Sequence, residues 1–182
     1  MADTSYLDWP FFEDRHRELA TRLDAWASAN LDGIDHGDVD AACRDLVGRL
    51  AGGEWLRHAA IDDTDPNSKL DVRSLCLIRE TLARYDGLAD FAFAMQGLGS
   101  GAISLFGTEA HQREWLPKVR SGKGIAAFAL TEPKSGSDAA NIALDARRGG
   151  DDFVLNGEKT WISIGGIADF YCVFARTGEA PG

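Results

Sequence analysis

The spacing of apolar residues changes near Gly122, and this change most limits the folds open to the chain. Before Gly122, apolar residues recur every three or four positions, as on one face of a helix. After it they alternate or cluster in short runs, as in strands. The sequence therefore predicts an α+β fold, with an all-helical domain over residues 1–122 and the beginning of a β domain over residues 123–182.

Capping residues and apolar stripes predict the limits of the first three helices. The helices are expected to begin near Pro10, after Asp38 or Asp40, and after Asp71, because these residues suit a first turn or an N-cap. Their apolar faces are formed by Leu19, Leu23 and Trp26, by Leu46, Val47 and Leu50, and by Leu75, Ile78, Leu82 and Tyr85.

Two further helices are expected between residues 91 and 119. Residues 91–105 are apolar on nearly all sides, which predicts a buried helix with a small-residue break at Gly97, Gly99 and Gly101. Thr108 suits the N-cap of the next helix, over residues 109–119, and Pro117 is expected to end or bend it.

Turn residues divide the second half of the chain into short strands. Apolar runs predict strands at residues 125–131, 142–146, 153–155, 159–164 and 170–175. Arg148-Gly149-Gly150-Asp151 predicts a turn. Asn156-Gly157 is the strongest two-residue hairpin signal, so we expect the strands on either side of it to pair.

The charge balance narrows the range of partners. The 182 residues carry a formal net charge of −10, which repels phosphate backbones and anionic lipid, so we expect neither nucleic acid nor a membrane as partner. The first residues resemble neither a secretory signal nor a mitochondrial transit peptide. Cys43, Cys76 and Cys172 form no CxxC pair, which indicates reduced thiols in the cytoplasm. The histidines are scattered, and we predict no metal site.

The segment over residues 128–138, FALTEPKSGSD, combines a buried strand with a loop rich in hydroxyl groups. Pro133 would stop the strand and leave nearby amides and carbonyls available to a ligand, and Gly136 would allow close approach to the backbone. On composition alone, an ordinary exit from a strand into a loop explains the segment as well.

A second candidate, Trp161-Ile162-Ser163, follows the predicted hairpin turn. On an alternating strand, Trp161 and Ser163 point to the same side. An indole that packs on a plane and a hydroxyl that bonds to its edge suit a planar heteroaromatic ligand. Without further context, a core tryptophan beside a surface serine explains the pair equally well.

Together these segments resemble the acyl-CoA dehydrogenase family, whose members carry Leu/Val-Ser/Thr-Glu-Pro-x-x-Gly-Ser-Asp and, further along, Gly-x-Lys-x-Trp-Ile-Ser/Thr. Here these motifs read LTEPKSGSD over residues 130–138 and GEKTWIS over residues 157–163. The letters FGTE at 106–109 and WLP at 115–117 match the segment before the first motif. The resemblance covers residues 10–182. It implies an all-α N-terminal helical domain followed by an incomplete antiparallel β-barrel-like middle domain that binds flavin.

The resemblance implies FAD as the cofactor and places its contacts on both motifs. Thr131 would bond to the pyrimidine side of the isoalloxazine, Trp161 would lie against the ring system, and Ser163 would reach toward flavin N5. The full set of flavin contacts implied in this way is Phe128, Leu130, Thr131, Ser137, Trp161, Ile162 and Ser163. Ser137 would also touch the pantetheine arm of the substrate, and the acyl pocket would be lined by Phe91, Ala94 and Leu98.

The implied activity is α,β-dehydrogenation of an acyl-CoA thioester. A carboxylate removes the α-proton while the β-hydrogen passes as hydride to flavin N5, and the protein orients the substrate. In the family this carboxylate lies in a C-terminal helical domain, which we expect to be absent from these 182 residues, so no catalytic residue is assigned. Glu132 and Asp138 belong to the flavin-loop motif and are interpreted as structural.

The resemblance also implies a homo-oligomer, a dimer or tetramer, and an electron-transfer flavoprotein or similar acceptor as partner. One alternative is a related acyl-CoA oxidase or flavin monooxygenase, in which reduced flavin meets oxygen. Another is a non-catalytic binding subunit, if the chain ends at Gly182. Because the expected strands leave an open sheet edge, we expect the functional polypeptide to continue past Gly182 or to pair with a complementary subunit.

Overall fold

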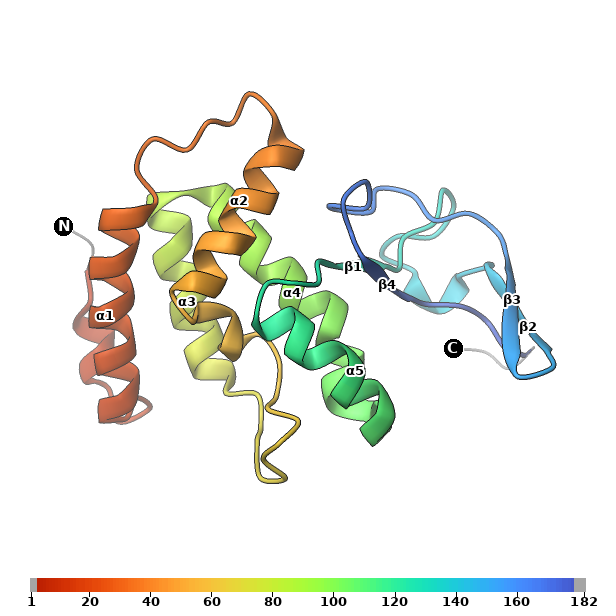
Figure 1. Cartoon of the computed structure of the whole chain (residues 1–182), viewed down its shortest axis with the longest axis horizontal. Coiled ribbons are helices and arrows are strands. Elements are labelled where there is room, and N and C mark those ends of the chain that lie inside the picture. Colours follow the sequence, from red (N-terminus) through yellow and green to blue (C-terminus); the bar gives the residue numbers. More distant parts are fainter. Residues whose placement is uncertain (1–2, 179–182) are drawn as a thin grey trace.

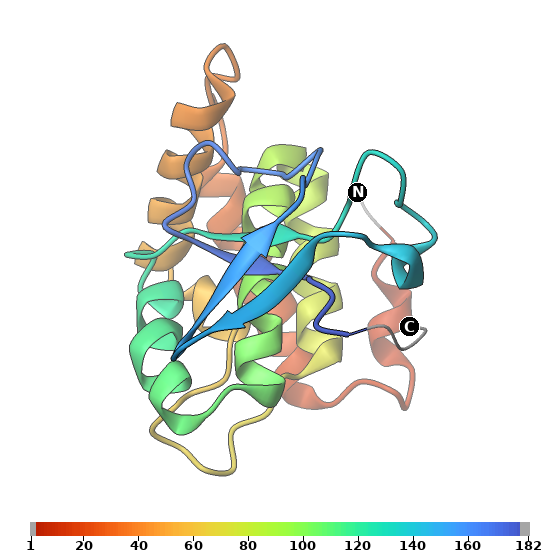
Figure 2. The ribbon, with the colours of Figure 1, turned by 90° about the vertical axis from the view of Figure 1, so that its right-hand side faces the viewer.

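The computed structural model describes residues 3–178, in which a group of helices lies beside two small sheets (Figure 1). When the molecule is turned, the strands lie in front of the helical part (Figure 2). The predicted continuation past Gly182 concerns residues outside this range. In chain order the elements are η1 (Ser5–Asp8), α1 (Asp14–Asn30), α2 (Val39–Gly52), η2 (Trp55–His58), α3 (Val72–Tyr85), α4 (Gly87–Phe106), α5 (Glu109–Arg120), β1 (Ala126–Ala129), η3 (Ala139–Asn141), β2 (Asp145–Gly149), β3 (Asp152–Asn156) and β4 (Phe170–Val173).

Helix α1 begins at Asp14, so the predicted start near Pro10 is wrong. The N-cap is Glu13, whose carboxylate accepts the amide of His16, while Nδ1 of His16 accepts the Glu13 amide at 3.0 Å. Because Nδ1 acts as acceptor, the buried ring donates from Nε2 to Asp71 at 2.9 Å. Asp71 caps α3, so this histidine joins the N-terminal ends of α1 and α3.

Carboxylate and hydroxyl caps define the starts of the other helices. The predicted caps Asp38, Asp71 and Thr108 are confirmed, since each side chain accepts an amide from the first turn of α2, α3 or α5. Helix α4 begins after Asp86, a buried cap that the sequence analysis did not assign and that accepts two amides. Helix α5 continues past Pro117 to Arg120, so the proline does not end it at once.

Helix α4 runs unbroken through Gly97, Gly99 and Gly101, so the predicted small-residue break is wrong. Gly99 instead permits a close approach, because a Cβ there would lie 2.6 Å from the Cβ of Ala126 in β1. The prediction that this helix is buried on nearly all sides is also wrong: Leu98 is 47% exposed, and the last apolar side chains of α4 are exposed as well. The helix therefore has one packed face and one open face.

The main core lies among α1–α4, and a smaller cluster joins α5 to β1. Gln96, buried in α4, accepts the backbone amide of Ala126 through Oε1 at 3.2 Å and so fixes β1 against the helix. The chain returns to the main core between β3 and β4, where Ile167 is buried. The largest fully buried side chains are Phe93, Leu23, Leu46, Leu50, Leu56, Leu77, Ile78, Leu82, Leu116, His16, Gln96 and Val47.

Strands β1 and β4 pair in parallel, with Ala126 opposite Phe170. The expectation of a purely antiparallel sheet is therefore wrong for this pair. A parallel pair needs a connection that carries the chain back to its starting end. Residues 130–169 form that connection, and both sequence motifs lie on it or beside it. Among residues 3–178 the strands form two separate pairs.

The second pair is the antiparallel hairpin of β2 and β3, which turns at Gly150 with a φ of 69°. The turn predicted at residues 148–151 and the strand predicted at residues 153–155 are confirmed. Strand β2 begins at Asp145, later than predicted, because the amides of Ala143 and Leu144 bond to a carboxylate and not to a neighbouring strand.

The predicted strand at residues 159–164 is absent, and Asn156-Gly157 does not form a hairpin turn. Trp161 and Ile164 have φ values of 58° and 51°, in the left-handed region that no strand uses. After Gly157 the chain turns toward the end of β1, where the backbone amide of Thr160 donates to the carbonyl of Thr131 at 2.9 Å. A contact made far along the sequence has thus overridden a strong local turn signal.

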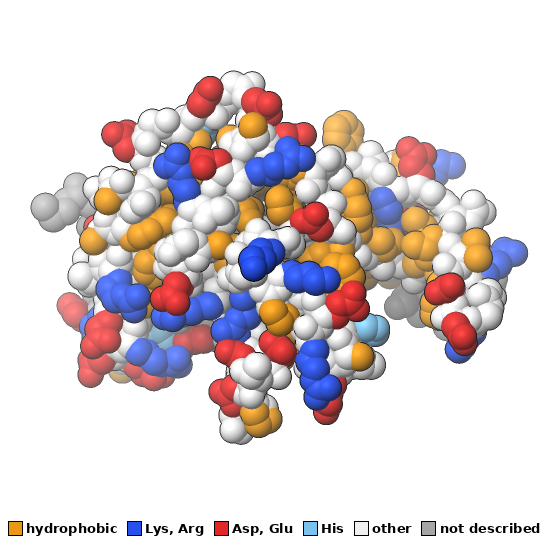
Figure 3. Space-filling view, viewed as in Figure 1, with side chains coloured by type: hydrophobic (Ala, Val, Ile, Leu, Met, Phe, Trp, Pro, Cys, Tyr) orange, Lys and Arg blue, Asp and Glu red, His pale blue; other side chains and the backbone are white. Residues whose placement is uncertain are grey.

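The surface differs between the two parts of the molecule. Acidic and basic side chains are interspersed over the helices, while hydrophobic side chains gather at the junction with the strands (Figure 3). Among residues 3–178, no helix combines the length and the apolar character needed to cross a lipid bilayer.

Candidate functional site

The first motif segment, residues 128–138, forms the end of β1 and a tight turn. Glu132 and Ser135 exchange backbone hydrogen bonds of 2.9 and 3.1 Å, and both residues are buried. Between them, Pro133 and Lys134 are exposed at the tip of the turn. The turn directly follows Thr131, which is half-buried. A proline in second place and the mutual backbone bonds explain why β1 cannot continue.

The carboxylate of Glu132 is held from three directions. It accepts the backbone amide of Ala143 at 2.6 Å, the amide of Leu144 at 2.9 Å and the ammonium of Lys159 at 2.8 Å. Burial alone would raise the pKa of Glu132, but the hydrogen bonds from Lys159 and the two amides outweigh burial and hold that pKa below its ordinary value. The carboxylate is therefore charged at neutral pH and engaged in joining backbone segments.

The second motif segment, residues 157–163, lies against the first. Lys159 donates to the carbonyl of Leu130 at 2.8 Å as well as to Glu132. The backbone amide of Thr160 donates to the carbonyl of Thr131. Gly157 permits this approach. It has a φ of 148°, and a Cβ there would lie 2.8 Å from the Cα of Leu144. Hydrogen bonds thus join two segments that are separate in the sequence.

Trp161 is 88% exposed, while Ile162 and Ser163 are half-buried. Because the segment is not a strand, the prediction that alternation brings Trp161 and Ser163 to one face is wrong. What the structure offers is a large indole that the described residues leave open to solvent. Such a ring can pack on a planar ligand. Ile164 and the buried Ile167 pack against the helical core and so fix the chain just after Trp161–Ser163.

The other residues assigned from the sequence lie in three places. Phe128 is half-buried and packs edge to face on Phe174, with ring centroids 4.9 Å apart. Ser137 lies on an exposed loop after the turn. On α4, Phe91 and Ala94 are half-buried and Leu98 is exposed, at a spacing that puts the three on one side of the helix.

Three residues that organise this region were given no role in the sequence analysis. They are Lys159, Gln96 and Asp169, the last of which accepts the amide of Ile125 at 2.8 Å and joins the starts of β1 and β4. Lys159 lies within a quoted motif, which was the only signal available. Gln96 and Asp169 each accept a backbone amide that lies 30 or 44 residues away in the sequence. No local sequence pattern predicts such a hydrogen bond.

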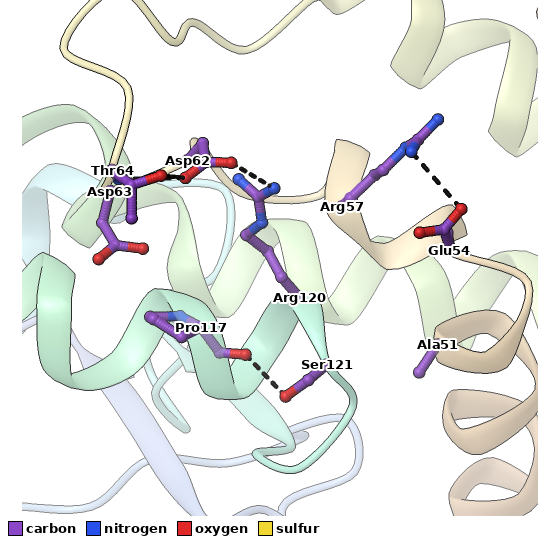
Figure 4. A pocket seen from close by; sticks show the side chains of 9 residues that line it. All are labelled: Ala51, Glu54, Arg57, Asp62, Asp63, Thr64, Pro117, Arg120 and Ser121. Atoms are coloured by element: carbon purple, nitrogen blue, oxygen red, sulfur yellow. Dashed lines mark hydrogen bonds and ion pairs between the residues drawn. The ribbon is translucent and has the colours of Figure 1, made fainter.

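A separate hollow of about 540 Å³ lies between the end of α2, η2 and the C-terminal turns of α5 (Figure 4). Four of its five charged side chains are paired with one another: Arg120 with Asp62 at 2.8 Å, and Arg57 with Glu54 at 3.6 Å. No residue of either motif segment lines it. We therefore regard it as distinct from the candidate site.

Two known protein domains match most of the chain. Residues 13–123 match the N-terminal domain of acyl-CoA dehydrogenases, and residues 127–182 match the middle domain. The chain belongs to the acyl-CoA dehydrogenase family. The resemblance carried by the two motifs is thereby confirmed, and both motif segments lie within the residues that match the middle domain.

Individual acyl-CoA dehydrogenases align over most of the chain. A probable acyl-CoA dehydrogenase of Mycobacterium leprae is 37% identical over 172 residues, which is 93% of this chain and 44% of that protein. A glutaryl-CoA dehydrogenase from Mycobacterium smegmatis in complex with FADH2 superposes with a TM-score of 0.79 and 29% identity, over 96% of this chain and 45% of that one. An acyl-CoA dehydrogenase from Bacillus anthracis complexed with FAD gives a TM-score of 0.76 and 32% identity, over 91% and 30%. The chain thus spans less than half the length of these relatives.

Proposed function

We propose that this chain supplies the flavin-facing surface and part of the acyl-facing surface of an FAD-dependent acyl-CoA dehydrogenase. The observation that carries the proposal is the direct joining of the two motif segments, through the amide of Thr160 on Thr131 and the ammonium of Lys159 on Glu132. It is supported by family membership and by relatives that were crystallised with FAD or FADH2.

The residues present suit the isoalloxazine of FAD. An indole that is 88% exposed can cover one face of a planar ring. In the proposal, Trp161 takes this role, Thr131 and Ser163 bond to the polar edge of the ring, and Phe128, Leu130 and Ile162 complete the contact. When bound, the flavin supplies the two-electron acceptor for α,β-dehydrogenation of an acyl-CoA thioester.

One side of α4, half-buried at Phe91 and Ala94 and exposed at Leu98, is proposed to contact the acyl chain. Phe91, Ala94 and Leu98 share one side of this helix, and α4 packs directly on β1 next to the first motif segment. Ser137, on its exposed loop, would contact both the flavin and the pantetheine arm. Glu132 is not assigned as catalytic base, because Lys159 and two amides already hold its carboxylate.

The larger assembly is part of the same proposal. Residues 1–122 would form the N-terminal helical domain, and residues 123–182 would form the first part of a barrel-like middle domain. The complete protein would be a homo-oligomer and would pass electrons to an electron-transfer flavoprotein or a similar acceptor.

The test is to express the protein from its complete reading frame and to measure flavin uptake and substrate reduction. We expect bound FAD in stoichiometric amount and bleaching of its visible absorption when an acyl-CoA thioester is added without oxygen. A panel of thioesters with short, branched and long acyl chains would then define the substrate. A purified, folded protein that takes up no FAD would contradict the proposal, and so would bound FAD that no acyl-CoA reduces.

A further inference from the structure

The ion pair between Glu132 and Lys159 stands apart from the others in the described part of the chain. Among residues 3–178 it is the only ion pair in which both side chains are less than 10% exposed, at 6% and 8%. Other ion pairs, such as Arg84 with Asp24, join residues further apart in the sequence, but the side chains of that pair are partly exposed. Burying two charges is costly unless every hydrogen-bonding group is satisfied.

Three backbone segments meet at this pair. The Glu132 carboxylate receives the amides of Ala143 and Leu144, which precede β2, and the Lys159 ammonium bonds to the carbonyl of Leu130 at the end of β1. The first motif segment, the approach to β2 and the second motif segment are therefore all fixed by two side chains. Of these contacts, only the bond to Leu130 involves a residue that we assign to the flavin, and that bond uses its backbone carbonyl.

The residues assigned to the flavin are direct neighbours of the pair. Thr131 precedes Glu132, and Trp161 lies two residues after Lys159. Trp161 has a left-handed backbone conformation and an exposed side chain, so packing by the described residues does not hold its position. The backbone on either side of Trp161 must therefore fix where the indole lies, and Lys159 is the buried contact on its N-terminal side.

We propose that Glu132 and Lys159 are positioning residues that hold Thr131 and Trp161 at the separation FAD requires, and that they act through the backbone without touching the cofactor. This inference rests on the proposed function. Both members are needed, because removal of one leaves the other as an unpaired buried charge. Replacement of both by uncharged side chains removes that penalty, so the double variant should be less impaired than the two single changes combined.

The experiment uses Glu132→Gln, Lys159→Met and the double variant in the protein expressed from its complete reading frame. Glu114→Gln makes the same chemical change at an exposed pair and serves as the matched control. His16→Ala removes a buried hydrogen bond between α1 and α3 and serves as a control for general loss of stability. The measurements are the Kd for FAD, the visible spectrum of the bound flavin, thermal unfolding, and amide hydrogen exchange without FAD.

We expect Glu132→Gln and Lys159→Met each to raise the Kd for FAD by ~10-fold or more. Both should shift the flavin spectrum and speed the exchange of the amides of Ala143, Leu144 and Thr160. The double variant should recover part of the lost affinity. Glu114→Gln should match the wild type, and His16→Ala should lower the unfolding temperature while it leaves the flavin spectrum unchanged.

Two results would overturn the inference alone. In the first, the wild type binds FAD, and the Glu132→Gln variant binds it with the same Kd and the same flavin spectrum. The other is a His16→Ala variant that loses as much affinity and shows the same spectral shift, because the pair would then have only a general structural role. A wild type that takes up no FAD contradicts the proposed function itself, and it overturns the positioning role with it, whatever hydrogen exchange shows.

Discussion

Replacing Trp161 with alanine separates a contribution to the fold from a contribution to the ligand. The residue is 88% exposed, so its truncation should change the free energy of unfolding by no more than ~0.5 kcal/mol. An aromatic side chain offers roughly 200 Å² of contact area. With 88% of it open and a planar ring on one face only, a ligand would cover about 90 Å². At ~25 cal/mol per Å², that contact contributes about 2 kcal/mol, or about 30-fold in Kd.

The assay is the quenching of FAD fluorescence on titration with Trp161→Ala, beside thermal unfolding of the same protein. Trp9→Ala is the matched control, because the Trp9 indole is 62% exposed and the residue precedes α1 in the sequence, outside both motif segments. We expect Trp161→Ala to weaken FAD binding without loss of stability, and Trp9→Ala to do neither. Wild-type affinity in Trp161→Ala would refute the assignment. A large fall in its unfolding temperature would show that the indole packs in the apo protein after all.

Three further predictions concern the fold. Gly99→Ala places a Cβ 2.6 Å from that of Ala126 and should destabilise the protein by ~1–3 kcal/mol in chemical unfolding, whereas Gly101→Ala meets nothing within 4 Å and should be neutral or slightly stabilising. His16→Ala removes a capping box and a buried bond to a carboxylate, and should cost roughly 2–4 kcal/mol in the same measurement; an effect below that of Gly101→Ala would refute the account. Burial acts to raise the pKa of Asp71. The hydrogen bonds from His16 and Ser74 and the charge of Arg15 outweigh burial and lower that pKa from 3.8 to about 2. As pH falls, the Asp71 carboxylate therefore takes up a proton in the unfolded chain before it does so in the folded protein. The stabilisation that Asp71 contributes is complete above its unfolded pKa of 3.8 and is lost as pH falls toward 2. In Asp71→Asn, the free energy of unfolding should therefore vary less with pH over this range.

Local chemistry accounts for the features that the sequence predicted well. The caps Asp38, Asp71 and Thr108 each bond to amides two or three residues away, so the signal and the contact occupy the same stretch of chain. The turn at residues 148–151 is likewise determined by its own glycines. The two family motifs did not depend on such local contacts. Neither motif alone identified the family, but both together did.

The failures arise where distant residues decide. Asn156-Gly157 is a strong hairpin signal, but the segment after it bonds to the end of β1, and the buried Lys159 completes that contact. The strand prediction for Trp161 and Ser163 failed with it. The glycines of α4 were interpreted as a break, although Gly99 makes room for β1, a strand that begins 27 residues later. Periodicity reports which side chains are apolar, and it does not report which backbone comes close.

The parallel pairing of β1 with β4 has a consequence for the order of folding. Ala126 and Phe170 are 44 residues apart, and they come together only after everything between them has been drawn into a closed loop. The entropic cost of closure grows with loop length, and pairings of this kind form slowly. The helices, by contrast, are built from contacts within one turn and can order first. The segments assigned to the flavin lie inside the late-closing loop, so a nascent chain would acquire its helices well before its capacity to hold a cofactor.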